Sequence, residues 1–485
     1  MGKSIIKNSV FNVVYRLLNV VFPMVTAMYV GRVLLPDGVG KVNYALNILS
    51  YFTVFASLGI PTYGAREIAR VQKEQGDRSK LFNELFILNF LSTFLCVILY
   101  FFMVFNIVSF QKELFLFLSI SIQLVLNFCN IDWFYQGMEE YAYITIRSTI
   151  IKIISLVLIF FFVKDQTDYV LYAFINCLAV TGNYIFNTCH LRGKVVLILK
   201  GLDLKRHVRP VLILLLTMLA SDLYNQIDIT MMGSLSTSKE IGYYSYAIKI
   251  VRIINTIPYA IVATTLPRLS QYYSENKTRE FKQLVSKSIN IVGLLVFPCA
   301  IGVIFLAEYI IEVLFGNIFF SSVHMLRILI PIIVVVPFSY MCGSIILTAT
   351  NKEKYLLIAT ICGGLTNVIL NMFMIPKYGG VGAGIASVLA EIIVFLVHIF
   401  FAWKYIKLDI SIKDILSFGV AMLGMCLSLF VVQRIIIKDF LVLFLSVVVG
   451  FMIYIILLIL LKNSILISFL SIIKVPLKIG NLKKR

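Results

Sequence analysis

The chain of 485 residues has little charge for its length, since Asp, Glu, Lys and Arg together make up 14% of it. A soluble domain typically carries about 25% charged residues and about 45–50% apolar ones. Here 60% of the residues are hydrophobic. This shortage of charge excludes a chain built mainly from soluble domains. It predicts an all-α polytopic membrane protein, because helices satisfy their own backbone hydrogen bonds in lipid.

Catalytic and metal-binding motifs are also missing. The four His residues are scattered, and there is no Walker lysine motif, no G-x-S-x-G and no H-E-x-x-H. The eight Cys residues lie almost all within apolar segments and form no C-x-x-C pair, so we expect small buried side chains and neither a disulfide framework nor a cysteine metal site. We therefore expect no enzyme and no cofactor. Energy for any transport must come from an ion gradient (sodium or protons), from the membrane potential or from downhill substrate flow.

What the chain does have is a series of long apolar runs. A transmembrane helix needs about 20 residues, and breaks at charged residues or at Gly and Pro divide the chain into fourteen such runs. They cover residues 8–31, 42–64, 83–108, 114–137, 142–163, 168–189, 209–232, 241–266, 287–313, 322–349, 355–375, 380–403, 414–436 and 439–461. The sequence thus predicts about fourteen transmembrane helices joined by short connections.

The basic residues are distributed unevenly between the two sides of these spans. Of the 43 Lys and Arg residues, 29 fall in connections or termini on one side and 8 on the other. The positive-inside rule then places both termini in the cytoplasm, and it explains the net charge of +19 without a nucleic-acid partner. The basic tail after the last span is suited to lie along the anionic inner leaflet of a bacterial plasma membrane, and a loose tail is the alternative.

Two segments of the chain repeat. Gly31, Gly40 and Tyr44-Ala45 recur, each 202 residues later, as Gly233, Gly242 and Tyr246-Ala247. Helices one to six would therefore match helices seven to twelve in the same orientation, as two lobes related by a parallel repeat around a central cleft. The predicted organisation is a lobe at 1–202, a lobe at 203–406 and, at 407–485, two C-terminal helices with a basic tail.

Six basic residues lie inside predicted spans, where a charge costs about 2.5–3.5 kcal/mol unless it faces water or an anion. They are Arg16, Arg147, Lys152, Lys249, Arg252 and Arg327. Positive charge at membrane depth indicates a hydrated pathway for an anion, and we take all six as candidate substrate-binding residues.

Other roles remain open for these charges. Lys249 and Arg252 could be neutralised by Asp222 or Asp228, Arg16 could reach the cytoplasmic interface, and Arg327 could pair with Glu312. The spacing of Ser245, Lys249, Arg252, Thr256 and Tyr259 places them on one helix face. The matching face of the second span reads Asn43, Asn47, Ser50, Val54 and Ser57. Both polar stripes are typical of cavity walls.

Polar residues in three other spans suggest a cation site. Asn367 and Asn371 are one helical turn apart, Ser387 lies in the next span, and Asp228 lies in the middle of the seventh. Oxygen ligands of this kind suit a hard cation. Intramembrane Asn side chains also hydrogen-bond neighbouring helices, and Asp228 could serve only to neutralise Lys249.

The N-terminal region has a recognisable sequence. It reads Tyr29-Val-Gly-Arg-Val-Leu-Leu-Pro-Asp-Gly-Val-Gly-Lys-Val-Asn-Tyr-Ala45, followed by Ser50-Tyr-Phe, Leu58-Gly-Ile60 and Tyr63-Gly-Ala-Arg-Glu-Ile-Ala69. This pattern resembles the Wzx-type polysaccharide flippases (O-antigen, capsule and teichuronic-type repeat units) of the multidrug/oligosaccharidyl-lipid/polysaccharide (MOP) exporter superfamily. The resemblance implies translocation of undecaprenyl-pyrophosphate-linked oligosaccharide units from the cytoplasmic to the outer leaflet. It also implies a cationic lumen, membrane lipids around the carrier and a polysaccharide polymerase as a partner.

The chain is more distantly similar to the MurJ-type lipid II flippases. That likeness implies that Arg16 and Lys249 stand approximately where the family has arginines on its first and eighth helices. It also implies a sodium site at Asp228, Asn367, Asn371 and Ser387, in which Asn371 replaces a second carboxylate of the family. The expected function is a repeat-unit flippase working by alternating access. The alternatives are a lipid II flippase or a cation-coupled multidrug exporter of the same superfamily, or a polymerase or ligase, which would need a large outer loop.

Overall fold

The computed structural model describes residues 5–198, 200–406 and 411–472, with the side chains of 5–20, 221 and 469–472 left out of the description. The described part of the chain is all-helical, and it divides into two compact units, Met1–Ser245 and Tyr246–Arg485. The all-α membrane fold expected from the sequence is confirmed.

Unit one contains the helices up to the start of α10. They are α1 (Ile5–Ser57), α2 (Ile60–Arg70), α3 (Gln75–Asn106), α4 (Val108–Gln111), α5 (Leu114–Val125), η1 (Asn127–Cys129), α6 (Asp132–Gly137), α7 (Tyr141–Phe162), η2 (Gln166–Asp168), α8 (Tyr169–His190) and α9 (Lys205–Leu235). Helix α1 packs on α3, α7 and α9, and α5 packs on α8. The core of unit one is apolar and aromatic, with Tyr100, Phe117 and Trp133 almost fully buried.

Unit two holds most of α10 (Ser238–Ala263) and the helices after it. They are α11 (Leu266–Ser274), α12 (Thr278–Phe315), η3 (Asn317–Phe319), α13 (Ser321–Tyr340), η4 (Met341–Leu347), α14 (Lys354–Ala402), η5 (Trp403–Tyr405), α15 (Ile412–Ile435), α16 (Asp439–Leu460) and α17 (Ser464–Ile472). The C-terminal pair α15 and α16 pack against each other and against α12. Large apolar side chains such as Phe430, Phe444 and Phe451 stay exposed on this pair, as lipid-facing residues would be.

Ten helices of the described residues are long and apolar enough to cross a membrane, or eleven if the bent pair Lys205–Ala220 and Asp222–Leu235 is one span. The chain is therefore a multi-pass membrane protein. The two longest candidates, Val21–Arg70 and Lys354–Tyr405, have 50 and 52 residues. At 1.5 Å per residue each is roughly 75 Å long, more than twice the thickness of the hydrocarbon core.

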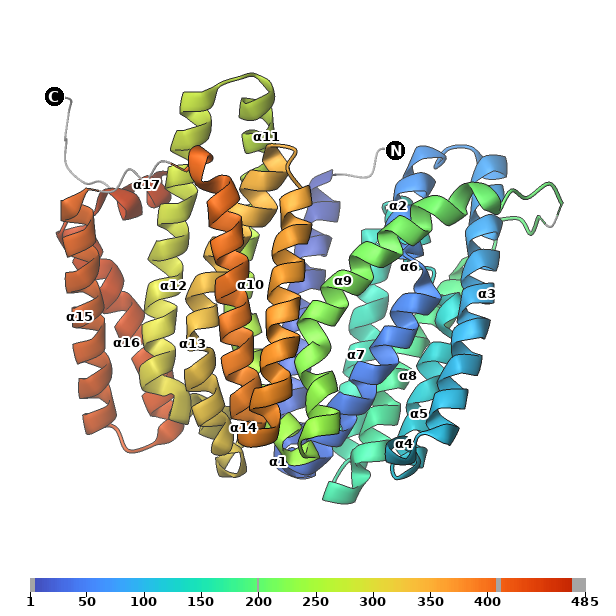
Figure 1. Ribbon diagram of the computed structural model, residues 1–485, viewed down its shortest axis with the longest axis horizontal. Helices are drawn as coiled ribbons and strands as arrows, with labels where there is room; N and C mark the ends of the chain where they lie inside the picture. The colour runs from blue at the N-terminus through green and yellow to red at the C-terminus, as the bar shows by residue number, and fades with distance from the viewer. Residues whose placement is uncertain (1–4, 199, 407–410, 473–485) are drawn as a thin grey trace. The chain divides into compact units, whose positions relative to one another are not determined.

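Each of these two long candidates bends where the sequence predicts a connection. The backbone leaves the helical region at Leu35, just before Pro36, and at Gly379. Figure 1 shows α1 and α14 each as two arms that meet at the bottom of the view. The bends agree with the predicted breaks at 31–42 and 375–380, while the total of fourteen spans and the lobe repeat stay predictions.

The predicted span 114–137 is interrupted in the structure. Helix α5 ends at Val125, and the chain passes through the turn η1 before α6. Asn127 in this turn is buried, and its side-chain amide lies 3.3 Å from the Ser57 hydroxyl and 3.4 Å from the Thr93 hydroxyl. Polar side chains from α1 and α3 thus provide hydrogen-bond partners for the Asn127 side chain at this break, which lipid could not.

Candidate functional site

Lys249 and Arg252 lie near the middle of α10, one turn apart. They are 11 and 14 residues from its first residue, Ser238, which is about 16 and 21 Å along a helix about 39 Å long. Lys249 is half-buried, with its Nζ 5.4 Å from the centre of the Tyr246 ring, whereas Arg252 is exposed. An exposed guanidinium at this depth requires water or an anion beside it, because its exposure to lipid would cost several kcal/mol.

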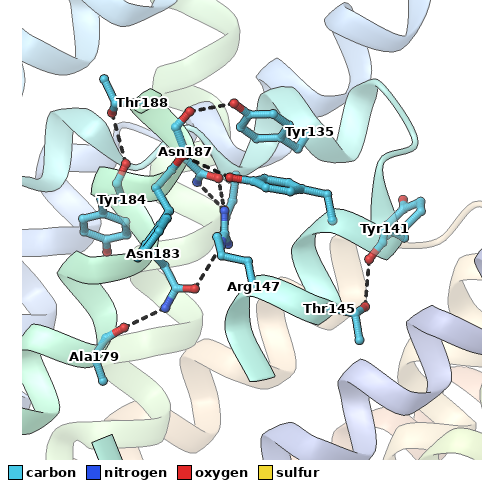
Figure 2. Close-up of polar contacts among 12 residues, drawn as sticks. Tyr135, Tyr141, Thr145, Arg147, Ala179, Asn183, Tyr184, Asn187 and Thr188 are labelled. Atoms are coloured by element: carbon cyan, nitrogen blue, oxygen red, sulfur yellow. Dashed lines mark hydrogen bonds and ion pairs between the residues drawn. The ribbon is translucent and has the colours of Figure 1, made fainter. Parts of the chain in front are cut away.

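Arg147 is in a different environment, enclosed by α6, α7 and α8 of unit one. Its guanidinium forms an ion pair of 2.8 Å with Asp132. It also donates to the side chains of Asn183, over 3.0 Å, and Asn187 (Figure 2). Only 5% of the side chain is exposed. Asn187 also donates to Asp132 over 2.6 Å, and the Tyr135 hydroxyl donates to the Asn187 carbonyl.

The enclosure of Arg147 has a direct consequence. The charge is balanced by a carboxylate and each guanidinium edge has a protein partner, so this residue meets the requirements of a structural charge. Its assignment to substrate binding stays a prediction, and Lys249 and Arg252 carry the stronger case.

The other predicted cations occupy varied surroundings. Lys152, on α7, is half-buried. Arg327 forms an ion pair of 3.0 Å with Glu308, where the sequence suggested Glu312, and both partners are about half exposed. The side chain of Arg16, in the first half of α1, lies outside the described residues. Their assignment as substrate-binding residues stays a prediction.

The expected cation ligands are hydrogen-bonded within each unit. In unit two, the Asn371 amide donates to the Asn367 side-chain oxygen over 2.8 Å, and the Ser387 hydroxyl donates to the Ala383 carbonyl. In unit one, Asp228 accepts a hydrogen bond of 2.6 Å from the Tyr244 hydroxyl. Within the described ranges, no group of three His, Cys, Asp or Glu residues could hold a metal ion. Sodium binding by these four residues stays a prediction.

The polar stripe predicted on the second span is used for helix pairing inside unit one. The Asn47 amide donates to the Thr230 hydroxyl on α9 over 2.7 Å, and the Tyr51 hydroxyl lies 2.7 Å from the same oxygen. The Gln226 amide donates to the Ser50 hydroxyl over 3.0 Å. We call this row of contacts the α1–α9 polar seam. The sequence analysis missed Gln226 and Thr230, although their spacing of four residues places them on one face of α9.

Beyond this seam, the two repeated glycine segments lie against each other. A Cβ atom added at Gly40 would lie 1.6 Å from the Ser238 carbonyl oxygen, and one at Gly242 would lie 2.0 Å from the Pro36 carbonyl oxygen. A Cβ at Gly233 would overlap the Tyr44 ring at 1.9 Å. Gly40 and Gly242 allow the bend of α1 and the start of α10 to touch backbone to backbone, and Gly233 allows the end of α9 to pack against the Tyr44 ring. We call these approaches at Gly40, Gly233 and Gly242 the glycine contact, and it lies at one end of the α1–α9 polar seam.

A second buried charge cluster fixes the start of α9, and the sequence analysis did not identify it. Glu84 on α3 is fully buried, and it accepts hydrogen bonds from Arg206, from His207 over 2.9 Å and from the Asp203 backbone over 2.8 Å. The Tyr63 hydroxyl lies 2.8 Å from His207 Nδ1. Glu84 therefore joins α3 to the first turn of α9.

Relatives of known description share much of this chain. A putative O-antigen transporter of Escherichia coli K12 is 20% identical, over 81% of this chain and 95% of its own length. The capsular polysaccharide biosynthesis protein CapF of Staphylococcus aureus is 22% identical, over 82% and 98%. A probable low-salt glycan biosynthesis flippase, Agl15 of Haloferax volcanii, is 25% identical over 48% of this chain, a match that spans about half of that relative.

Solved structures show the same fold. A lipid II flippase MurJ in an inward closed conformation superposes with a TM-score of 0.70 at 18% identity, covering 95% of this chain and all of that one. An inward-facing multidrug resistance MATE family transporter of the MOP superfamily gives 0.63 at 15% identity, covering 79% and 93%.

Two family profiles match the sequence itself. The MatE profile covers residues 214–373, and the profile described as polysaccharide biosynthesis protein covers 5–273, more than half of the chain. The resemblance to Wzx-type flippases of the MOP exporter superfamily is therefore confirmed, and the chain belongs to the polysaccharide biosynthesis protein family.

Proposed function

We propose that this protein translocates undecaprenyl-pyrophosphate-linked oligosaccharide units from the cytoplasmic to the outer leaflet of a bacterial plasma membrane by alternating access. The names of its relatives, an O-antigen transporter and a glycan flippase, support a lipid-linked glycan as the substrate. Both termini would be cytoplasmic, and a polysaccharide polymerase would receive the product.

One observation carries the proposal, namely the position of Lys249 and Arg252 in the middle of α10. A pyrophosphate headgroup must give up its hydration to cross the bilayer. Fixed cations in a medium of low dielectric offset this loss far better than cations in bulk water. Two charges one turn apart match the two phosphates of the carrier, and Arg252 is exposed to receive them. The sugar would follow through the hydrated space that these charges require.

The test uses proteoliposomes loaded with a fluorescent polyprenyl-pyrophosphate disaccharide. The double variant Lys249→Ala with Arg252→Ala should lower translocation at least about tenfold, since the loss of even one desolvated charge contact is worth more than 1.4 kcal/mol. The control is Arg434→Ala with Lys438→Ala, which removes two exposed cations near the ends of α15 and α16. Normal translocation by the α10 variant would contradict the proposal.

The same vesicles separate the rival substrates. Lipid II transported in preference to the repeat unit would favour the lipid II alternative, and efflux of an organic cation would favour the multidrug alternative. We expect no efflux of an organic cation, because a site built from Lys249 and Arg252 repels cations. Lipid II carries the same pyrophosphate as the repeat unit, so the expected preference for the repeat unit rests on the names of the relatives. The lipid-linked disaccharide should be the better substrate.

A further inference from the structure

A basic cavity of about 780 Å³ lies in unit two, between the first turns of α12 and the helix α17. Three cations line it, Arg279, Lys282 and Lys287, all on α12. Hydroxyl groups of Thr278 and Ser286 lie on the same wall. Among the described residues that line the cavity there is no carboxylate. The cavity is therefore suited to an anion.

The α12 wall is a single helix face. Arg279, Lys282, Ser286 and Asn290 follow one another at spacings of three and four residues. Asn290, at the inner end of this row, has a buried side-chain oxygen without a hydrogen-bond partner, whereas Arg279 and Lys287 at the outer part are exposed. The row thus runs from exposed charge to a buried polar group.

The opposite wall, α17, is held in place by side-chain contacts. Asp414 on α15 accepts hydrogen bonds from the Ser464 backbone over 2.8 Å and from the Ser464 hydroxyl over 2.7 Å. The Asn463 side chain accepts from the Leu466 backbone over 3.0 Å, and Leu466 is buried in the core formed with α15 and α16. The cavity is therefore formed before any ligand arrives.

The surroundings of the cavity indicate a lipid rather than a soluble anion. Ile291 and Ile465 line it next to the polar groups. One and two turns beyond Asn290 on the same face, α12 continues with Leu294, which is buried in the core of unit two, and with Phe297, which is 42% exposed. Since α12 is one of the candidate membrane spans, the charges sit where the span begins and the apolar residues sit deeper. This order, charge outside and hydrocarbon inside, matches a phospholipid.

We propose that this cavity binds the phosphate headgroup of an anionic phospholipid of the cytoplasmic leaflet, with the acyl chains lying along α12. Basic pockets between helices on the cytoplasmic side of membrane proteins are suited to such headgroups. The site lies outside the residues assigned to transport, so it does not depend on the proposed flippase activity. Bound lipid would join α12 to α17.

The experiment measures lipid binding to the full chain by native mass spectrometry in detergent, with phosphatidylglycerol and phosphatidylcholine as probes. Phosphatidylglycerol should bind saturably and more tightly than phosphatidylcholine. The variant Arg279→Gln with Lys282→Gln and Lys287→Gln should lose about fivefold in affinity for each cation removed. Gln283→Glu, at an exposed position that also lines the cavity, adds a negative charge without removing a cation and should weaken binding too.

The matched control is Arg268→Gln with Lys354→Gln and Lys413→Gln, which removes three exposed cations that do not line the cavity. Its phosphatidylglycerol affinity should stay normal. Equal losses in both triple variants would overturn the proposal, because general surface attraction would then explain the binding. So would a cavity variant that binds phosphatidylglycerol normally but no longer binds polyprenyl pyrophosphate, because the cavity would then belong to the transported lipid.

Discussion

At the scale of single residues, two of the cations inside predicted spans differ in what surrounds them. The guanidinium of Arg147 is enclosed, with Asp132, Asn183 and Asn187 around it, while that of Arg252 is exposed in the middle of α10. Removing one partner of a buried ion pair leaves an uncompensated buried charge, whereas an exposed cation at membrane depth lies where a hydrated anion can reach it. Charge at depth alone does not distinguish these roles.

This difference predicts distinct mutational effects. Arg147→Met should destabilise the protein by about 3 kcal/mol, because it leaves Asp132 without its counter-charge, and Asp132→Asn should have a similar effect. The double variant should lose less than the sum of the two single changes, since neither unpaired charge remains. Reversible unfolding in detergent measures each of these free energies.

The control for this cycle is Arg434→Met, an exposed cation whose removal should change stability by less than about 0.5 kcal/mol. If Arg147→Met left the free energy of unfolding unchanged and lowered only translocation, the guanidinium would serve the substrate and the structural role would be wrong.

Sequence reasoning could locate the charges but not their partners. Arg147 and Asp132 lie on separate helices, and the contact between them depends on how α6, α7 and α8 pack. Likewise, Arg327 on α13 has two candidate partners one turn apart on α12, Glu308 and Glu312. The register of the two helices decides between them, and it selects Glu308. Partner choice is a tertiary property.

At the scale of helices, the breaks were more predictable than the contacts. Pro36 restricts the residue before it, and the chain bends at Leu35. The interruption between α5 and α6 was not expected, because the run 114–137 is apolar throughout most of its length. Asn127 lies in this break, and its side-chain partners come from α1 and α3. A buried Asn in an apolar run is the signal that could have indicated it.

The glycine contact in unit one yields a prediction at this scale. Gly40→Val should leave no room for the Ser238 carbonyl oxygen, which would lie 1.6 Å from the new Cβ atom, so the bend of α1 and the start of α10 must separate. Under the proposed alternating access, the end of the polar seam should then fail to close, and translocation should fall at least about tenfold. The measurement is the proteoliposome assay, together with the amount of folded protein.

Gly419→Val is the matched control, because a Cβ at Gly419 on α15 meets nothing within 4 Å. It should keep normal translocation. If Gly40→Val translocated as fast as this control, close contact between the repeated glycine segments would have no part in transport.

At the scale of the whole molecule, the uneven charge of the connections and the path of the chain describe the same topology. In unit two, α11 and α17 lie at one end and the turn between α15 and α16 lies at the other (Figure 1). The first end carries Arg268, Lys277 and Arg279, whereas the α15–α16 turn has Arg434 and Lys438 beside it. The placement of these connections at opposite ends of unit two is what the predicted topology requires, and the orientation in the membrane stays a prediction.

The last prediction concerns this topology. An alkaline phosphatase inserted after Ile437, whose side chain is 94% exposed in the α15–α16 turn, should be active, because we expect that turn to face the outside. The same enzyme inserted at Asn276, in the turn between α11 and α12, should be inactive, because the surrounding basic residues retain that turn in the cytoplasm. A fluorescent protein at the same two sites should give the opposite pattern. Activity at Asn276 alone would reverse the membrane orientation, and activity at both sites would contradict the placement of the two turns on opposite sides. Either result would overturn the assignment of the basic cavity to the inner leaflet.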